Sequence, residues 1–341
     1  MHHHALTRWF ALACAVAAGF FLPVLLGGSG LVYNTLVVIA IFAVMAYGVD
    51  IVWSDLGEVS LAHTVFFAAG AYTSAILSTR YGVSAWLTLP AAVVVSVVLA
   101  LLLGLLTLKT REFIFSLVTY SAGIVCLSIA QNWQFLGGSD GIVGVPPLKL
   151  SVTSGGAPAI GNQAIWPYAY VLLLLTMYLV ARFRRSALGH AALMVHMNQR
   201  LATLSGIDPR RVRLKVFVLS AGVTSLAGWM YAYQRSYVGP DLFDTYFLVL
   251  MLTAVVLSGQ RLLIGPLLGT ALLMSQKAFL SYGGYFDKIV LGCVLIFVLA
   301  VYPRGLIGLW EIASGFFRRK KTVNDGDPTA TPGSTPSSGK P

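Results

Sequence analysis

Hydroxyl and imidazole side chains stand among small residues in the segment from 57 to 77, GEVSLAHTVFFAAGAYTSAIL. Such groups can exchange hydrogen bonds with a polar solute or with a neighbouring helix, and small residues let helices approach closely. For the histidine, a hydrogen bond within the protein is favoured over contact with a solute. The candidates for a polar pathway are Ser60, His63, Thr64, Gly70 and Tyr72, with Tyr120 added from a later apolar segment.

The other residue types that carry chemistry form no catalytic, cofactor-binding or metal-binding set. Cys14, Cys126 and Cys293 lie far apart in apolar segments, so they give neither a disulfide framework nor a metal-ligand spacing. The stretch from Gly333 to Lys340 resembles a phosphate loop only superficially, because its spacing is too long and no strand or helix is expected beside it. We therefore expect no enzyme activity, no cofactor and no metal, and no ATP hydrolysis by this chain.

Long apolar segments must position the candidate side chains. The chain of 341 residues is 57% hydrophobic and 10% charged, with a mean hydropathy of +0.80, so it has too few polar residues to cover a soluble surface. We predict an all-α, polytopic membrane protein with about ten transmembrane helices, each of roughly 20 residues. Their approximate ranges are 5–27, 31–52, 61–78, 84–108, 113–131, 166–183, 214–234, 245–259, 264–281 and 287–303.

The spans at 245–259 and 264–281 are short, and Ser258, Gly259, Gln260 and Arg261 separate them. They are either two complete spans or one broken, re-entrant pair, and the sequence leaves both open.

The distribution of basic residues predicts the orientation of the spans. Lys and Arg accumulate on the cytoplasmic loops of membrane proteins. With ten spans and a cytoplasmic N-terminus, both chain ends and the basic loop at 184–215 lie in the cytoplasm. The net charge of +11 then reflects these loops and their attraction to membrane lipid, and it requires no nucleic-acid partner. Of the 23 basic residues, five fall at outer positions: Arg80, Lys149, Arg235, Lys277 and Lys288.

Charged residues are almost absent from the centres of the spans. A charge there costs about 2.5–3.5 kcal/mol on insertion scales, so an embedded charge normally marks a pathway or a proton relay. Asp50, Asp55 and Glu58 cluster at the inner end of one span, and a second set of acidic residues lies at outer loops or ends: Asp140, Asp241, Asp244 and Asp287. An ion-coupled secondary transporter is expected to place a carboxylate near the midplane. This alternative therefore ranks second.

The loop at 184–215 predicts one or two short amphipathic helices. Ala187, Ala191, Met194, Leu201 and Leu204 recur at roughly helical spacing, with polar residues between them. A glycine at 206 can end a helix in a left-handed conformation, and Asp208 followed by Pro209 is typical of a helix start. The loop is either a helix lying on the membrane surface or a docking surface for a cytoplasmic partner.

Two further segments lie outside the spans. The outer loop at 133–165 is rich in Gly, Ser and Pro, which favour turns. Residues 322–341 have the composition of a disordered tail. We therefore predict a transmembrane domain at 1–321, with the loops at 133–165 and 184–215, and a disordered cytoplasmic tail at 322–341.

Five stretches in order along the chain carry a family resemblance. The stretch at 57–77 is quoted above. The others are GGSDGIVGVP at 137–146, the stretch from RSALGHAAL at 185–193 to RLATLSGIDPRRVRLKVFVLSAGVTSLAGWMYAYQRSYVGPDLF at 200–243, SGQRLLIGPLLGTALL at 258–273 and YPRGLIGL at 302–309. Together they resemble the permeases of branched-chain amino acid ABC transporters of the LivM type, and the related urea and amide permeases. Met197, Asn198 and Gln199 stand where that family usually has acidic residues, which implies an ATPase partner adapted to a neutral or basic surface.

The resemblance implies the architecture of an ABC importer permease in a bacterial inner membrane. It implies four kinds of partner besides membrane lipid: a second, homologous permease, two cytoplasmic ABC ATPase subunits, and a periplasmic solute-binding protein. The solute is expected to be small and amphipathic: a branched-chain amino acid, urea, an amide or an aromatic acid. The residues implied to couple to the ATPase are His190, Asn198, Leu201, Ala202, Gly206 and Ile207.

Overall fold

The computed structural model describes residues 16–107, 112–148, 153–154, 157–158 and 161–279, together with residues 289, 293 and 296. A short helix at Val16–Leu25 comes first. The longer helices that follow are α2 (Gly30–Leu56), α3 (His63–Arg80), α4 (Ala85–Thr107), α5 (Glu112–Asn132), α6 (Asn162–Arg184), α7 (Ala187–Met197), α8 (Gln199–Leu204), α9 (Pro209–Arg235), α10 (Thr245–Ser258) and α11 (Gly265–Phe279). The described part of the chain is therefore mostly α-helical, as the sequence predicts.

The predicted spans between residues 31 and 281 each coincide with one of these helices. By length and composition, α2, α4, α6, α9 and the 114–132 part of α5 are each long and apolar enough to cross a membrane. The fourteen residues of α10 extend only about 21 Å, which is less than the ~30 Å hydrocarbon core. The first predicted span is described only from residue 16 onwards. The tenth span, apart from three isolated residues, and the tail at 322–341 lie outside the described residues.

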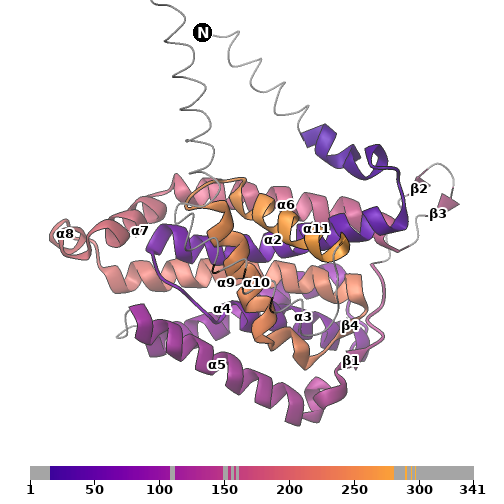
Figure 1. Ribbon diagram of the computed structural model, residues 1–341. Coiled ribbons are helices and arrows are strands. Elements are labelled where there is room, and N and C mark those ends of the chain that lie inside the picture. The colour runs from indigo at the N-terminus through magenta and orange to yellow at the C-terminus, as the bar shows by residue number, and fades with distance from the viewer. Residues whose placement is uncertain are drawn as a thin grey trace, which may run out of the picture.

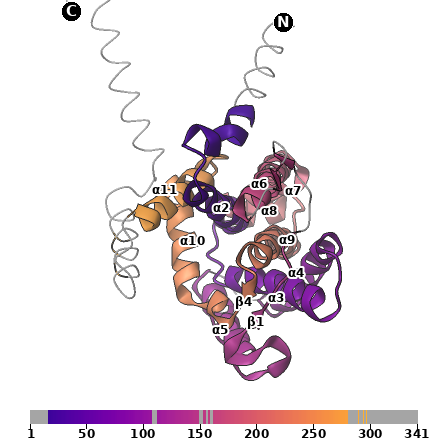
Figure 2. The ribbon, with the colours of Figure 1, turned by 90° about the vertical axis from the view of Figure 1, so that its right-hand side faces the viewer.

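Helices α2 and α9 form the centre of the bundle. Each has 27 residues, or about 40 Å of helix, which is enough to cross a membrane. Helix α2 packs against α6, α9, α10 and α11, while α9 packs against α3 and α4 as well. Figure 2 views this arrangement from one end and shows α2 and α9 in the middle, with α5 on the periphery. The central position explains why α2 is buried around most of its circumference.

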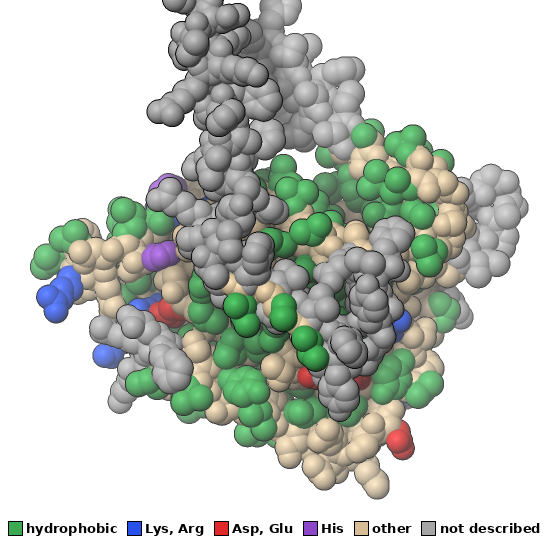
Figure 3. Space-filling model, in the orientation of Figure 1, with side chains coloured by type: hydrophobic (Ala, Val, Ile, Leu, Met, Phe, Trp, Pro, Cys, Tyr) green, Lys and Arg blue, Asp and Glu red, His purple; other side chains and the backbone are tan. Residues whose placement is uncertain are grey.

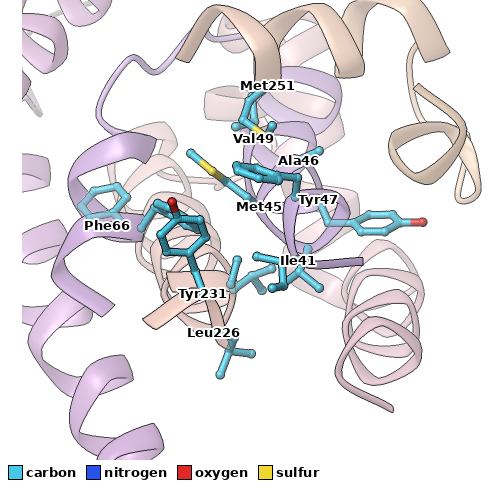
Figure 4. Packing of buried hydrophobic residues seen from close by; sticks show 14 of the residues in the cluster. Ile41, Met45, Ala46, Tyr47, Val49, Phe66, Leu226, Tyr231 and Met251 are labelled. Atoms are coloured by element: carbon cyan, nitrogen blue, oxygen red, sulfur yellow. The ribbon is translucent and has the colours of Figure 1, made fainter. Parts of the chain in front are cut away.

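Small residues set the spacing between α3 and α9. A Cβ atom at Gly70 of α3 would overlap the backbone carbonyl of Ser225, and one at Gly228 of α9 would overlap the carbonyl of Phe67. Any side chain at either glycine would force the two backbones apart. Figure 4 shows the core beside this crossing, where labelled side chains from several helices, Met45, Phe66, Tyr231 and Met251 among them, lie close together.

Short strands and 3-10 turns close the end of the bundle opposite α7 and α8 (Figure 1). The 3-10 turns η1 (Gln134–Leu136) and η2 (Gly138–Asp140) lead into strand β1 (Ile142–Val143), which pairs antiparallel with β4 (Tyr237–Val238). A second pair joins β2 (Thr153–Ser154) to β3 (Ala157–Pro158). The turn η3 (Pro240–Phe243) follows β4 and contacts α3 and α5. The loop at 133–165 is thus pinned to the segment that precedes α10.

Candidate functional site

Side-chain caps define the helices of the loop between α6 and α9. The hydroxyl of Ser186 accepts a hydrogen bond from the backbone N–H of Gly189 at 3.2 Å and starts α7. The side-chain carbonyl of Asn198 accepts from the backbone of Arg200 and Leu201 at 3.0 and 3.1 Å and starts α8. These caps satisfy backbone donors that no helix can satisfy internally. We call the unit from Ala187 to Ile207 the α7–α8 loop.

The turn after α8 confirms the local prediction for this loop. Gly206 has φ of +80°, and the backbone N–H of Ile207 donates to the carbonyl of Ala202 at 3.0 Å. Asp208 then accepts a hydrogen bond from the backbone of Arg210 at 3.0 Å, with Pro209 at the start of α9. A Cβ atom at Gly206 would meet no other atom within 4 Å. Gly206 therefore provides the positive φ that the turn needs, and the space around its Cβ position is open.

The α7–α8 loop presents apolar side chains to its surroundings. Met197, Leu201 and Leu204 are 76%, 60% and 84% exposed. The exposed Arg200 and Arg210 lie beside them in the chain. Figure 3 shows hydrophobic and basic side chains together at the left end of the molecule, where Figure 1 places α8. Such a mixed, protruding surface is suited to contact a partner.

The large apolar residues that recur at helical spacing in this loop are not the residues that pack against the bundle. Met194, Leu201 and Leu204 are exposed, and the buried positions are Gly189, Ala192, Val195 and Ala202. Close contact with the bundle selects small residues here, because a Cβ atom at Gly189 would overlap the backbone carbonyl of Phe183. The amphipathic helices exist as predicted, but the larger apolar residues point away from the protein.

The six predicted coupling residues all lie on the α7–α8 loop, but their surroundings differ. His190 is exposed, and its Nδ1 lies 2.8 Å from the carbonyl oxygen of Ser186. Asn198, Leu201 and Gly206 are exposed too, while Ala202 is buried and Ile207 is half-buried against the core. The exposed set is thus His190, Asn198, Leu201 and Gly206.

The loop is held against the end of α2. Gly57 ends α2 with φ of +71°, and a Cβ atom there would lie 2.7 Å from Cδ2 and Nε2 of His196 in α7. The two elements therefore touch at a residue without a side chain.

Beside this contact lies a cluster of buried ion pairs. The guanidinium of Arg184 donates to Asp50 at 2.6 Å and to Asp55 at 3.2 Å. Arg261 pairs with the other oxygen of Asp55 at 3.2 Å. Asp50 and Asp55 have side chains that are 0% exposed, and such carboxylates need partners of opposite charge. The acidic cluster was visible in the sequence, but its partners come from the ends of other helices.

A parallel ion pair joins the same region to α9. Nε of Arg213 lies 2.8 Å from Oε1 of Glu58, and both side chains are largely buried. Glu58 belongs to the non-helical segment between α2 and α3. Ion pairs therefore join several elements at the end of the bundle that carries the α7–α8 loop. These elements are the end of α2 with the segment after it, the end of α6, the start of α9, and the turn between α10 and α11.

A cavity of about 670 Å³ lies between α3, α5 and α10. Thr64 and Tyr120, two of the predicted pathway residues, are on its wall, and the hydroxyl groups of Tyr120 and Thr245 lie 3.4 Å apart. Leu61, Ile124, Leu127 and Leu248 add apolar surface, and Gln131, Ser139, Asp241 and Asp244 add polar groups. Burial raises the pKa of the Asp241 carboxyl above its usual range. The mixed wall suits a solute with both apolar and polar parts.

The other predicted pathway residues are not on the wall of this cavity. Ser60 and His63 are buried together, and Nδ1 of His63 lies 3.2 Å from the carbonyl oxygen of Ser60. Gly70 faces α9 instead. Tyr72 is buried and stacks on Phe243, which does line the cavity, with ring centroids 6.1 Å apart. Among the described residues, no three His, Cys, Asp or Glu side chains gather as a metal site.

Comparisons with known proteins identify the family. Residues 31–299 match the family model for the permease component of the branched-chain amino acid transport system. The LivM permease proteins of the high-affinity branched-chain amino acid transport systems of Salmonella typhimurium and Escherichia coli are each 28% identical over 287 residues, which cover 78% of this chain and 68% of each relative. The inner membrane ABC transporter permease protein YjfF of Escherichia coli is 26% identical over 286 residues, 79% of this chain and 80% of that protein.

No solved protein structure gives a significant match to the chain. The family match covers most of the sequence and confirms the resemblance seen in its motifs. The chain belongs to the family of branched-chain amino acid transport system permease components, and it is a transport subunit of the ABC type, not an enzyme.

Proposed function

We propose that the chain is the transmembrane permease subunit of an ATP-driven importer, and that its α7–α8 loop docks on a cytoplasmic ATPase. The single observation that carries this proposal is the exposure of Leu201 and Leu204 beside the open side of Gly206. Side-chain caps and contacts with the bundle fix the shape of the loop, while its large apolar side chains find no partner in the described part of the chain. A partner that covers them gains hydrophobic energy without reordering the loop.

The position of the loop favours docking over a helix lying on the membrane. Figure 1 shows α8 at the far end of the molecule, beyond the points where α2 ends and α9 begins. A surface-lying helix needs a long apolar face parallel to the membrane, and α8 has only six residues. The α7–α8 loop projects along the bundle, where a partner below the membrane would meet it.

The basic residues give this end of the bundle a cytoplasmic orientation. On this proposal both chain ends are cytoplasmic and the protein lies in a bacterial inner membrane. Its partners are a homologous permease, two ATPase subunits and a periplasmic binding protein. The acidic residues usual for the family are replaced here by Met197, Asn198 and Gln199, so the matching ATPase is adapted to a neutral or basic surface.

The cavity between α3, α5 and α10 is the proposed pathway for the solute. Thr64 and Tyr120 supply hydroxyl groups, and Ile124 and Leu248 supply apolar surface. A small amphipathic solute fits this combination. The names of the LivM relatives favour a branched-chain amino acid. Urea, an amide or an aromatic acid remain the other candidates, because the binding protein selects the solute before it reaches the permease.

The proposal is tested by transport in proteoliposomes. The chain is reconstituted with its permease and ATPase partners, and uptake of radiolabelled leucine, urea, acetamide and phenylacetate is measured in the presence of the binding protein. We expect uptake of one of these solutes only when ATP is supplied on the side of the α7–α8 loop. Uptake by the chain alone under a proton or sodium gradient would contradict the proposal and establish an ion-coupled transporter.

A further inference from the structure

Two helix ends meet at a single buried carboxylate. Arg184 closes α6 just before the α7–α8 loop begins, and its Nε donates to Oδ2 of Asp55 at 3.2 Å. Arg261 lies in the turn between α10 and α11, and its Nη1 lies 3.2 Å from Oδ1 of the same residue. The Asp55 side chain is 0% exposed. One carboxylate at the end of α2 therefore binds both elements, each through its own oxygen.

The turn between α10 and α11 is tied to α2 by backbone groups as well. The N–H of Arg261 donates to the hydroxyl of Ser54 at 3.2 Å, and that hydroxyl donates to Asp50 at 2.5 Å. The hydroxyl of Tyr47 donates to the carbonyl of Leu263 at 2.6 Å. Arg261 itself has φ of +59°, which a residue with a side chain rarely adopts. These bonds hold the turn in one defined position against α2.

The other end of α10 reaches the cavity. Thr245 and Leu248 in its first turn lie on the cavity wall, and Asp244 caps the helix by accepting a hydrogen bond from the backbone of Tyr246 at 3.0 Å. A helix of fourteen residues moves as a rigid unit, so a displacement of its last residue displaces its first. Arg261 lies just beyond the last residue of α10, Ser258, so a shift of the turn at Arg261 would be transmitted along α10 to the cavity.

We propose that Arg184, Asp55 and Arg261 form a relay that positions α10 in response to the α7–α8 loop. Separating either arginine from Asp55 would remove an ion pair from a carboxylate that is 0% exposed, so the three groups are expected to move together. A partner that pushes the loop moves Arg184 at the end of α6, Asp55 follows, and Arg261 carries α10 with it. The residues of the relay contact no solute; they are positioning residues. This inference rests on the proposed function, because it needs an ATPase to move the loop.

The test measures movement across the cavity in the complex with its ATPase partners. Cys14, Cys126 and Cys293 are replaced by Ser, and spin labels are attached to cysteines introduced at Ser128 in α5 and Leu252 in α10. Neither labelled position lies on the cavity wall. The distance between the labels is measured without nucleotide and with ATP plus vanadate. In the parent complex, we expect ATP to shift this distance.

Two pairs of variants separate a relay from a merely structural contact. Arg261→Gln removes the charge that reaches Asp55, while Arg261→Lys keeps it, and both keep a side chain at the strained backbone position. Asp55→Asn removes the shared charge but leaves Arg184 paired with Asp50. Arg211→Gln is the control, because Arg211 pairs with Asp208 at 3.2 Å on the exposed surface at the start of α9.

We expect Arg261→Gln and Asp55→Asn to lower the population of the shifted distance at least about fivefold, the lower end of typical allosteric coupling, while ATP hydrolysis continues. Arg261→Lys recovers most of the shift, and Arg211→Gln keeps all of it. A full shift in both Arg261→Gln and Asp55→Asn would overturn the relay and leave the proposed function standing. No ATP-dependent shift in the parent complex would overturn both.

Discussion

The imidazole ring of His196 in α7 lies directly against Gly57, the residue that ends α2. This contact brings the α7–α8 loop to the same helix end that carries Asp55 and its two arginines. It depends on the absence of a side chain at Gly57, because a Cβ atom there would lie 2.7 Å from the ring. The loop is therefore seated on the bundle by shape as well as by charge.

A side chain at Gly57 is expected to unseat the loop. Gly57→Ala adds both a strained positive φ, worth about 1–2 kcal/mol, and a collision with His196. We expect its thermal unfolding midpoint to fall below that of Gly82→Ala. Gly82 has φ of +63° and no atom within 4 Å of its Cβ position, so it carries the strain without the collision.

A double-variant cycle isolates the contact. Removing the ring in Gly57→Ala/His196→Ala relieves the collision, so the two changes together should cost at least about 0.5 kcal/mol less than their sum. Equal midpoints for Gly57→Ala and Gly82→Ala, with additive costs in the cycle, would show that the His196 contact does not seat the loop.

Cysteine labelling tests the orientation. A cysteine at Ser154, in β2, should react with an impermeant thiol reagent added outside the inner membrane of intact cells. A cysteine at Thr203, which is exposed in α8, should react only after the reagent is given access to the cytoplasm. The parent has its own cysteines replaced by Ser. The opposite labelling pattern would reverse the orientation and place the α7–α8 loop out of reach of an ATPase.

Filling the cavity is expected to stop transport without unfolding the protein. Gly123 lies on the cavity wall in α5, and a Cβ atom there would come no closer than 3.9 Å to its nearest neighbour, Val65. Gly123→Ala therefore fits without a clash, and the change from Gly to Ala favours the helix by about 1 kcal/mol. Because the methyl group leaves most of the cavity open, uptake should stay close to that of the parent. Gly123→Trp places a large ring in the cavity and should abolish uptake.

The measurements on the Gly123 variants are solute uptake and the thermal unfolding midpoint, made on the same preparations. A Gly123→Trp variant that is stable and still transports at the parental rate would exclude this cavity as the pathway.

Local sequence signals predicted the helices well. The length of the apolar segments predicted the spans, because a segment that crosses lipid must satisfy its backbone polar groups within a helix of about 20 apolar residues. Gly206, Asp208 and Pro209 predicted the turn and the start of α9 from conformational preferences of single residues. These features need no information from distant parts of the chain.

Contacts between distant parts of the chain could not be predicted from such local signals. The partners Asp50 and Arg184 are 134 positions apart, so only the fold brings them together. Gly70 was a candidate for the pathway, but it lies against α9, because small residues favour close helix contact as readily as an open path. Thr64 and Tyr120 do share a cavity, yet its far wall comes from η3 and α10. No local sequence pattern predicts that α3, α5, η3 and α10 line one cavity.

The most direct test of the account replaces Gly206 by Trp and measures how much ATPase co-purifies with the membrane-inserted protein. Gly206→Trp adds bulk to the proposed docking surface and strain at φ of +80°. The matched control is Gly82→Trp, which has similar φ and an equally open Cβ position, but lies between α3 and α4, far along the chain from the loop. We expect both variants to reach the membrane in parental amounts. Gly206→Trp should lose at least about tenfold in ATPase association, or roughly 1.4 kcal/mol, together with ATP-driven uptake, while Gly82→Trp keeps its ATPase. Parental ATPase association in Gly206→Trp would contradict the account and leave the α7–α8 loop as a helix on the membrane surface.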